Sequence, residues 1–154
     1  MQIKCILKRN KFILTIILIG FVIFFSSKYL ISICIIHGNS MFPTLRDKSI
    51  VIESKNTKNI LNGDIVIIKK NNLKMVKRVM GIPGNSLVIK DNYLYVDNIK
   101  FDNIYIEDTG MLNTEIVLKE NEYIVLGDNR NESIDSRDAE IGIIKKEEII
   151  GKII

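Results

Sequence analysis

The chain has 154 residues, 22 Lys and Arg against 18 Asp and Glu, one His, two Cys and 47% hydrophobic residues. This length suits one domain with one additional segment, and the apolar content is sufficient for a packed core. One His and two Cys are too few for a structural zinc site, a zinc-water hydrolase or a disulfide-stapled fold. We therefore expect neither a metal nor another cofactor.

The net charge of +4 has its origin in the first eleven residues. They contain four basic side chains and no acidic one, whereas the remaining residues balance. A basic surplus confined to a leader differs from the broad basic surface that binds nucleic acid. We therefore expect no nucleic-acid partner.

An uncharged apolar stretch, residues 12–25, follows this leader, and Lys28 is the single charged residue from 12 to 36. A helix of about 17–20 apolar residues crosses the hydrocarbon core of a bilayer. We predict a transmembrane signal-anchor at 12–29, with residues 1–11 as a cytoplasmic basic leader and 30–154 outside the cell membrane. A cleaved secretory signal is one alternative, although the stretch lacks a good small-x-small exit site. A buried core helix is the other.

The sequence beyond residue 36 consists of short apolar runs separated by Asn, Asp and Gly, the pattern of strands joined by tight turns. We predict a mostly β domain with many loops, ending in a short helical turn at 146–150 and a last strand. Asp91-Asn92 and Asp97-Asn98 are predicted turns. The predicted strands are 49–53, 64–69, 74–80, 86–89, 93–96 and 123–126.

A serine nucleophile in this chain would need a base other than histidine. The single His, His37, precedes Ser40 by three residues at the expected membrane boundary, where the two side chains are poorly placed to pair. Lysine can act as a base when burial in apolar surroundings lowers its pKa. Lys77 meets that requirement because Met75 and Val79 flank it on one face of a predicted strand. A lysine without a catalytic role remains the alternative at this position.

Ser40 lies in the segment G-N-S-M-F-P-T-L at residues 38–45. Pro43 fixes its own backbone angle, and Gly38 permits an unusual one. A rigid loop of this kind can hold a hydroxyl and a backbone N–H at one point, as acyl transfer requires. A plain turn would have the same composition.

A second charged segment, G-D-N-R-N-E-S-I-D-S-R-D, occupies residues 127–138. One interpretation is a solvated loop. The other is a loop beside a site that is stiffened by ion pairs among Asp128, Arg130, Asp135 and Arg137.

Taken together, four segments resemble bacterial type I signal peptidases. They are S-M-F-P-T-L from Ser40, N-G-D-I-V at 62–66, K-R-V-M-G-I-P-G from Lys77, and G-D-N-R-N-E-S-I-D-S-R from residue 127. They follow the apolar stretch in the order of that family and span essentially the whole chain. The resemblance implies a compact β-rich signal-peptidase-like catalytic domain tethered by one N-terminal transmembrane helix. It also implies a serine endopeptidase that removes N-terminal signal peptides from exported preproteins.

The resemblance assigns roles to individual positions. Ser40 corresponds to the nucleophile, its backbone N–H to an oxyanion donor, and Lys77 to the general base. Ser133 corresponds to the serine that hydrogen-bonds and orients the lysine amine. The residues that correspond to the family's structural ion pairs around the site are Arg78, Asp128, Asp135 and Arg137.

The sequence departs from the family at two positions. Many relatives carry a serine two residues before the nucleophile as a second oxyanion donor, whereas this chain has Gly38 there. The family's P-G-D is P-G-N here, with Asn85, a difference that we expect to matter little. Substrates are expected to bind as an added strand, with small residues at the first and third positions before the cut in shallow apolar pockets.

Two other classes share some of these features. Soluble self-cleaving repressors and mutagenesis proteins also use Ser and Lys on a β fold, but they carry a DNA-binding head or a cut site in their own arm. A catalytically silent, membrane-tethered binding module is the second alternative. The intact Ser40, Lys77 and Ser133 argue against it.

Overall fold

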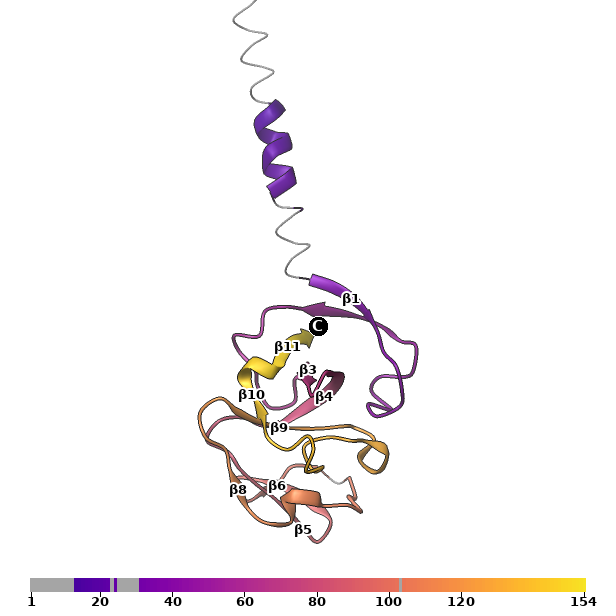
Figure 1. Ribbon diagram of the computed structural model, residues 1–154, viewed down its shortest axis with the longest axis vertical. Helices are drawn as coiled ribbons and strands as arrows, with labels where there is room; N and C mark the ends of the chain where they lie inside the picture. Colours follow the sequence, from indigo (N-terminus) through magenta and orange to yellow (C-terminus); the bar gives the residue numbers. More distant parts are fainter. Residues whose placement is uncertain (1–12, 23, 25–30, 103) are drawn as a thin grey trace, which may run out of the picture.

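The computed structural model describes residues 13–22, 24, 31–102 and 104–154. Residues 13–22 are helical and stand apart from a β-rich body (Figure 1). Within the described residues, no helix combines the length and apolarity needed to span a membrane. The predicted basic leader, residues 1–11, lies outside the described residues, as do positions 12, 23 and 25–29 of the predicted anchor.

Eleven strands of the described residues form two antiparallel sheets (Figure 1). The larger sheet has the order β1-β2-β11-β3-β4-β9-β10, and the smaller one β7-β6-β5-β8. The strands are β1 (Ile31–Ile35), β2 (Ile50–Ser54), β3 (Ile65–Lys70), β4 (Leu73–Gly81), β5 (Ser86–Lys90), β6 (Tyr93–Val96), β7 (Ile99–Lys100), β8 (Ile116–Val117), β9 (Glu122–Leu126), β10 (Ile144–Lys145) and β11 (Ile149–Ile153). Three short 3-10 helices are η1 (Gly110–Asn113), η2 (Arg130–Glu132) and η3 (Lys146–Glu148).

The prediction of a mostly β domain is confirmed, and all six predicted strands are present within one or two residues of their expected bounds. The predicted helical turn before the last strand is η3. Asp91-Asn92 and Asp97-Asn98 form the two predicted turns, and all four residues have positive φ. Paired positive φ values match the right-handed twist of the strands in a two-residue hairpin, which is why Asn and Asp occur there.

Strand β9 is buried on both faces, which explains its continuous apolar run. Ile124 and Leu126 pack into one core cluster with side chains of β5 and β6. Tyr123 and Val125 point the other way, into a second cluster formed with β3, β10 and β11. The two clusters therefore hold β9 and its neighbour β4 firmly in the centre of the domain.

Strand β4 has different neighbours along its length. Its partner β3 pairs with residues 73–78, and β9 pairs only from Arg78 to Gly81, with a bulge between Val79 and Gly81. The first half of β4 therefore has one edge without a strand partner among the described residues. At the far end of the sheet, β1 pairs only with β2.

Candidate active site

The Ser40 loop follows β1 and is held by its own backbone. The Phe42 N–H donates to the Asn39 carbonyl at 3.0 Å, and the Leu45 N–H donates to the Met41 carbonyl at 2.9 Å. The Met41 side chain is 1% exposed and fixes the loop to the core. Across the molecule, the Asn129 N–H donates to the Ser40 carbonyl at 3.0 Å, which joins this loop to the segment after β9.

Lys77 lies on β4, opposite Val66 of β3, and only 3% of its surface is exposed. Burial lowers the pKa of its ammonium group; the negative charge of Asp135 opposes this effect and the positive charge of Arg137 adds to it. Within the described part of the chain, Lys77 forms no ion pair. Lys77 therefore loses its proton at a lower pH than a solvated lysine does.

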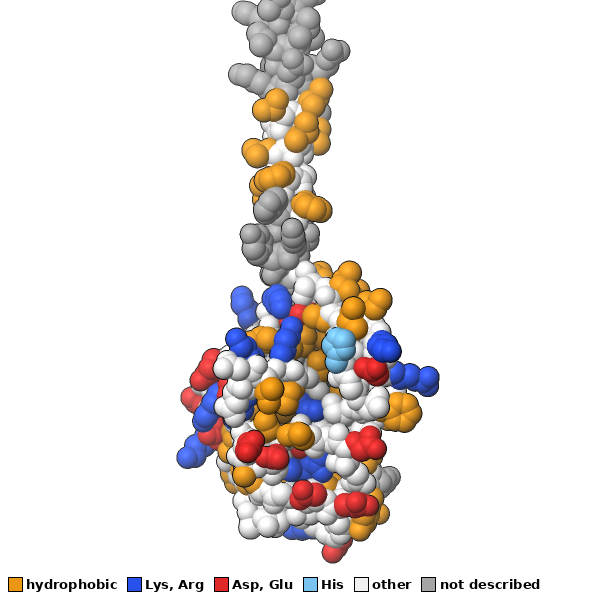
Figure 2. Space-filling model, turned by 45° about the vertical axis from the view of Figure 1, so that its right-hand side comes forward, with side chains coloured by type: hydrophobic (Ala, Val, Ile, Leu, Met, Phe, Trp, Pro, Cys, Tyr) orange, Lys and Arg blue, Asp and Glu red, His pale blue; other side chains and the backbone are white. Residues whose placement is uncertain are grey.

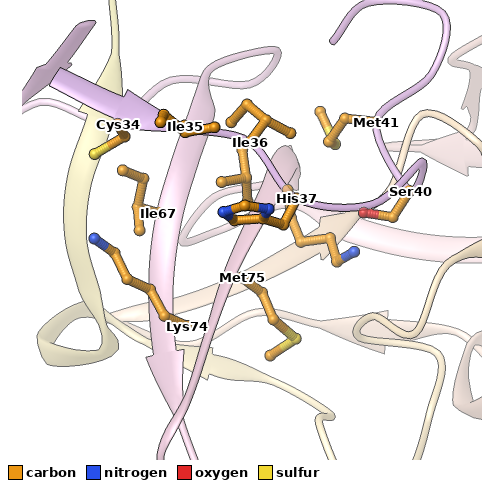
Figure 3. Close-up of a pocket in the computed structure, with 11 residues that line it drawn as sticks. Cys34, Ile35, Ile36, His37, Ser40, Met41, Ile67, Lys74 and Met75 are labelled. Atoms are coloured by element: carbon orange, nitrogen blue, oxygen red, sulfur yellow. The ribbon is translucent and has the colours of Figure 1, made fainter. Parts of the chain in front are cut away.

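Ser40 and Lys77 line the same pocket, which has a volume of about 320 Å³. Its walls come from the end of β1 and the Ser40 loop on one side and from the first half of β4 on the other, and Ile67 of β3 contributes to its lining. Figure 3 shows Ser40 at one end of this pocket, the aliphatic side chain of Ile36 between the two ends, and Ile67 toward the other end. The pocket thus combines a hydroxyl, a buried amine and an apolar wall.

His37 also lines this pocket and is exposed (Figure 3). It makes no hydrogen bond to Ser40 in the described part of the chain. A Ser-His pairing is therefore not formed.

The four charged residues assigned to structural ion pairs form two such pairs. Arg78 makes a two-pronged contact with Asp128, at 2.7 Å from Nε to Oδ1 and 2.6 Å from Nη2 to Oδ2. Burial would raise the pKa of Asp128, but the hydrogen bonds from Arg78 and Thr44 outweigh it and the pKa falls. Two oriented bonds of this kind fix the guanidinium plane next to the Ser40 loop.

The second pair is more deeply buried. Arg137 Nε donates to Asp135 Oδ1 at 2.8 Å, and the other carboxylate oxygen accepts the Gly127 N–H at 2.9 Å. Arg137 also donates to the backbone carbonyls of Arg130 and Asp108, at 2.5 and 3.0 Å. This pair therefore ties the loop after β9 into a rigid unit.

The prediction that Arg130 pairs with an acidic residue of its own loop is wrong. Its Nη2 donates to Asp102 at 2.8 Å, and its Nε donates to the Gly127 carbonyl at 3.0 Å. Asp102 lies in a loop after β7, so no local sequence pattern could have identified it.

Gly127 also belongs to the candidate site, although the sequence motif that contains it does not single it out. A Cβ added there would lie 2.5 Å from the Ser40 carbonyl oxygen and 2.5 Å from the Ser133 Cβ. Real Cβ atoms do not approach other atoms so closely, so the position requires glycine. The hydroxyl of Ser133 is buried and has no hydrogen-bond partner among the described residues. Its predicted bond to Lys77 stays a prediction.

The two departures from the family pattern have clear local structures. Gly38 has a φ of +86°, and its N–H donates to Asp47 Oδ1 at 2.9 Å. The Asn85 side-chain oxygen accepts the Ile82 N–H at 3.1 Å, and its amide nitrogen donates to Asp97 at 2.7 Å. Asn85 thus closes its turn through the same side-chain oxygen that an aspartate would supply.

A β-rich fold with a serine and a buried lysine on one pocket defines the class of candidate serine hydrolases that use lysine as the base. Comparisons with known proteins then give the family. The family model described as "Signal peptidase, peptidase S26" matches residues 9–154. The chain therefore belongs to the peptidase S26 family of signal peptidases, which are serine endopeptidases, and it has the type I signal peptidase function.

Individual relatives agree with this assignment. Signal peptidase I U of Bacillus subtilis is 33% identical over 154 residues, covering 90% of this chain and 82% of the relative. Signal peptidase IB of Staphylococcus aureus is 31% identical over 166 residues, covering 93% and 86%. A crystal structure of a signal peptidase I from Enterococcus faecalis matches with a TM-score of 0.50 and 24% identity, over 63% of this chain and 98% of the other. At this identity the structural match supports the fold.

Proposed function

We propose that Ser40 and Lys77 are the catalytic dyad with which this type I signal peptidase cleaves exported preproteins. The observation that carries the proposal is that a lysine with 3% of its surface exposed and a lowered pKa lines the same pocket as Ser40. A lysine can accept a proton near neutral pH only if its ammonium form is destabilised. Burial at the centre of the sheet supplies that destabilisation.

In the proposed reaction, neutral Lys77 takes the hydroxyl proton of Ser40 while the serine oxygen bonds to the scissile carbonyl carbon. The Ser40 N–H, which has no hydrogen-bond acceptor among the described residues, holds the resulting oxyanion. The C–N bond then breaks, and the Lys77 ammonium gives its proton to the leaving amine. Lys77 next takes a proton from water as that water attacks the ester carbonyl. When the bond to the Ser40 oxygen breaks, Lys77 gives this proton to that oxygen, which restores the Ser40 hydroxyl and the neutral amine and releases the signal peptide with a free carboxyl group.

Ser133 is proposed to orient the Lys77 amine. The register that pairs Arg78 with Leu126 continues to Lys77 opposite Gly127, and directly opposed residues project to the same face of a sheet. The missing Gly127 side chain leaves the space that Ser133 fills, so the unpartnered Ser133 hydroxyl lies on the face that Lys77 occupies. A neutral amine is a suitable partner for that buried hydroxyl.

The substrate is proposed to bind as an added strand between β1 and the first half of β4. Each of these strands has an edge without a strand partner among the described residues, and both strands flank the pocket. Such an edge supplies main-chain hydrogen bonds to an extended peptide, and the adjoining apolar walls accept small side chains next to the cut. Ile36, Met41 and Val76 would form these walls near Ser40.

The proposed setting is the outer surface of the cell membrane, with residues 12–29 as the anchor, the leader 1–11 in the cytoplasm and residues 30–154 outside. An unusual sheet face supports contact with the bilayer. The isoleucines of β1 and β2 that face outward are 46–75% exposed, namely Ile31, Ile33, Ile35, Ile50 and Ile52. Hydrophobic side chains gather at the end of the domain next to the N-terminal segment in Figure 2. A patch of this kind fits the apolar part of a membrane.

The test is cleavage of preproteins by the detergent-solubilised full chain, with the new N-termini identified by mass spectrometry. Ser40→Ala and Lys77→Ala should each lower kcat/KM by several orders of magnitude. Lys90→Ala, at an exposed lysine of the smaller sheet, is the matched control and should retain activity. Full cleavage by either dyad variant would refute the proposal.

A further inference from the structure

The pocket ends, away from Ser40, at Cys34 and Lys74, and Cys34 joins it to a polar cluster on β1 and β2 that the proposed dyad does not use. Glu53 of β2 is 1% exposed, and its carboxylate accepts hydrogen bonds from Ser32 at 2.7 Å and from the Cys34 thiol at 3.0 Å. It also forms an ion pair with Lys55. Burial would raise the pKa of Glu53, but the bonds from Lys55, Cys34 and Ser32 and the charge of Lys74 lower it to about 2. The carboxylate is therefore ionised and fully partnered.

Lys74 is the remaining charged group of this cluster. It is exposed, and it forms neither a hydrogen bond nor an ion pair among the described residues. Figure 3 shows its amine beside Ile67 and Cys34, at the end of the pocket opposite Ser40. Its directly opposed neighbour on β3 is Lys69, which adds a second positive charge.

The charges at this end do not cancel. Lys55, Lys69 and Lys74 carry three positive charges, and Glu53 supplies one negative charge that is already paired with Lys55. A peptide in the pocket would therefore meet a positive potential at the end away from Ser40.

The spacing along β4 identifies which substrate residue meets this charge. Lys74 precedes Lys77 by three residues, about 10 Å at 3.3 Å per residue. An extended peptide beside β4 advances by the same rise, so a residue three before the scissile position lies level with Lys74. That residue is the fourth before the cut, and the long lysine side chain also reaches the fifth.

We propose that Lys74 is a specificity-determining residue that favours an acidic side chain, and disfavours a basic one, at the fourth or fifth position before the cut. This inference rests on the proposed function, because it takes Ser40 as the point of cleavage. The interaction is partly solvated, so the preference is modest, about two- to fivefold in kcat/KM.

The experiment compares three peptide substrates that differ only in having Asp, Gln or Lys at the fourth position before the cut. Cleavage is measured with the full chain in an uncharged detergent, at low and high salt. The wild type should cleave the Asp peptide about two- to fivefold faster than the Lys peptide, and salt should reduce this ratio. Lys74→Glu should invert the ratio between the Asp and Lys peptides.

Lys90→Glu is the matched control, because Lys90 is exposed and lies in the smaller sheet. An unchanged ratio in Lys74→Glu, or an equal change in Lys90→Glu, would overturn the inference. A preference that arises only when anionic lipid is added would also overturn it and would indicate a headgroup site instead.

Binding of the same peptides to Ser40→Ala, followed by fluorescence anisotropy, separates this inference from the proposed dyad. If the charge preference is present in binding, the inference holds even where the cleavage assay contradicts the dyad. If the Gln peptide is cleaved normally but neither assay shows a charge preference, the dyad stands and the inference fails.

Discussion

Gly127→Ala is the substitution that tests most directly how the site is assembled. The added methyl group would lie 2.5 Å from the Ser40 carbonyl oxygen and 2.5 Å from the Ser133 Cβ, so backbone must move on at least one side. Overpacking of a closely packed region costs about 1–3 kcal/mol of folding free energy. The variant should stay folded but lose much of its activity, because displacing a reacting group by about 1 Å can cost roughly 100-fold in rate.

The assay is kcat/KM for a preprotein together with urea unfolding of the same preparation. Gly84→Ala is the matched control: Gly84 has a φ of +92° but open space around its Cα. An alanine there is strained by about 1–2 kcal/mol but touches nothing in the site. We expect comparable stability losses and an activity loss of about 100-fold in Gly127→Ala alone. If Gly127→Ala kept the kcat/KM of the wild type, the conclusion that Ser40 and Ser133 lie too close to residue 127 to admit a side chain would be refuted.

Two further predictions concern pH. Because the proposed base Lys77 accepts a proton only when it is neutral, kcat/KM should rise with pH to a midpoint below the usual lysine value of 10.5. Asp135→Asn should move that midpoint lower, because it removes a charge that raises the Lys77 pKa, and a midpoint that moves upward would contradict the proposed role. Glu53, whose pKa falls from 4.5 to about 2, stabilises the fold fully above pH 4.5, and this contribution disappears as the pH falls toward 2. The difference in unfolding free energy between wild type and Glu53→Gln should therefore narrow between pH 5 and pH 2.5 in urea titrations, and a constant difference would count against the buried carboxylate.

The parts of the fold that the sequence predicted are those with local causes. Strands such as β6 and β9 consist of β-branched and aromatic residues bounded by Asn and Asp turns, and both properties can be recognised in a few residues. β1 was not predicted, because Ile31–Ile35 reads as a continuation of the apolar stretch before it. Its outward isoleucines are exposed, which reverses the usual relation between hydrophobicity and burial.

The residues of the candidate site also divide into those that the sequence identifies by a local pattern and those that only the structure reveals. Ser40, Lys77 and the charged loop at 127–138 were identified because their motifs co-occur in one order. The Arg130–Asp102 ion pair and the hydrogen bonds of Glu53 with Ser32 and Cys34 were not, because they join segments whose proximity depends on the tertiary fold. Nothing in the I-V-I-E-S run of β2 distinguishes Glu53 from an ordinary solvated charge at a strand end.

The register of the larger sheet links the buried Lys77 to the open edge of β4. β9 pairs with β4 only from Arg78 onward, and the chain turns away after Gly127, opposite Lys77. The departure of β9 leaves the first half of β4 with an edge that a peptide can pair with. At the same point the loop after β9 folds back: its Ser133 fills the space beside Gly127, and the charges of its Asp135–Arg137 pair act on the pKa of Lys77. A β9 strand longer by two residues would bury Lys77 equally well but would close the edge, so the length of β9 decides whether the buried lysine can meet a substrate.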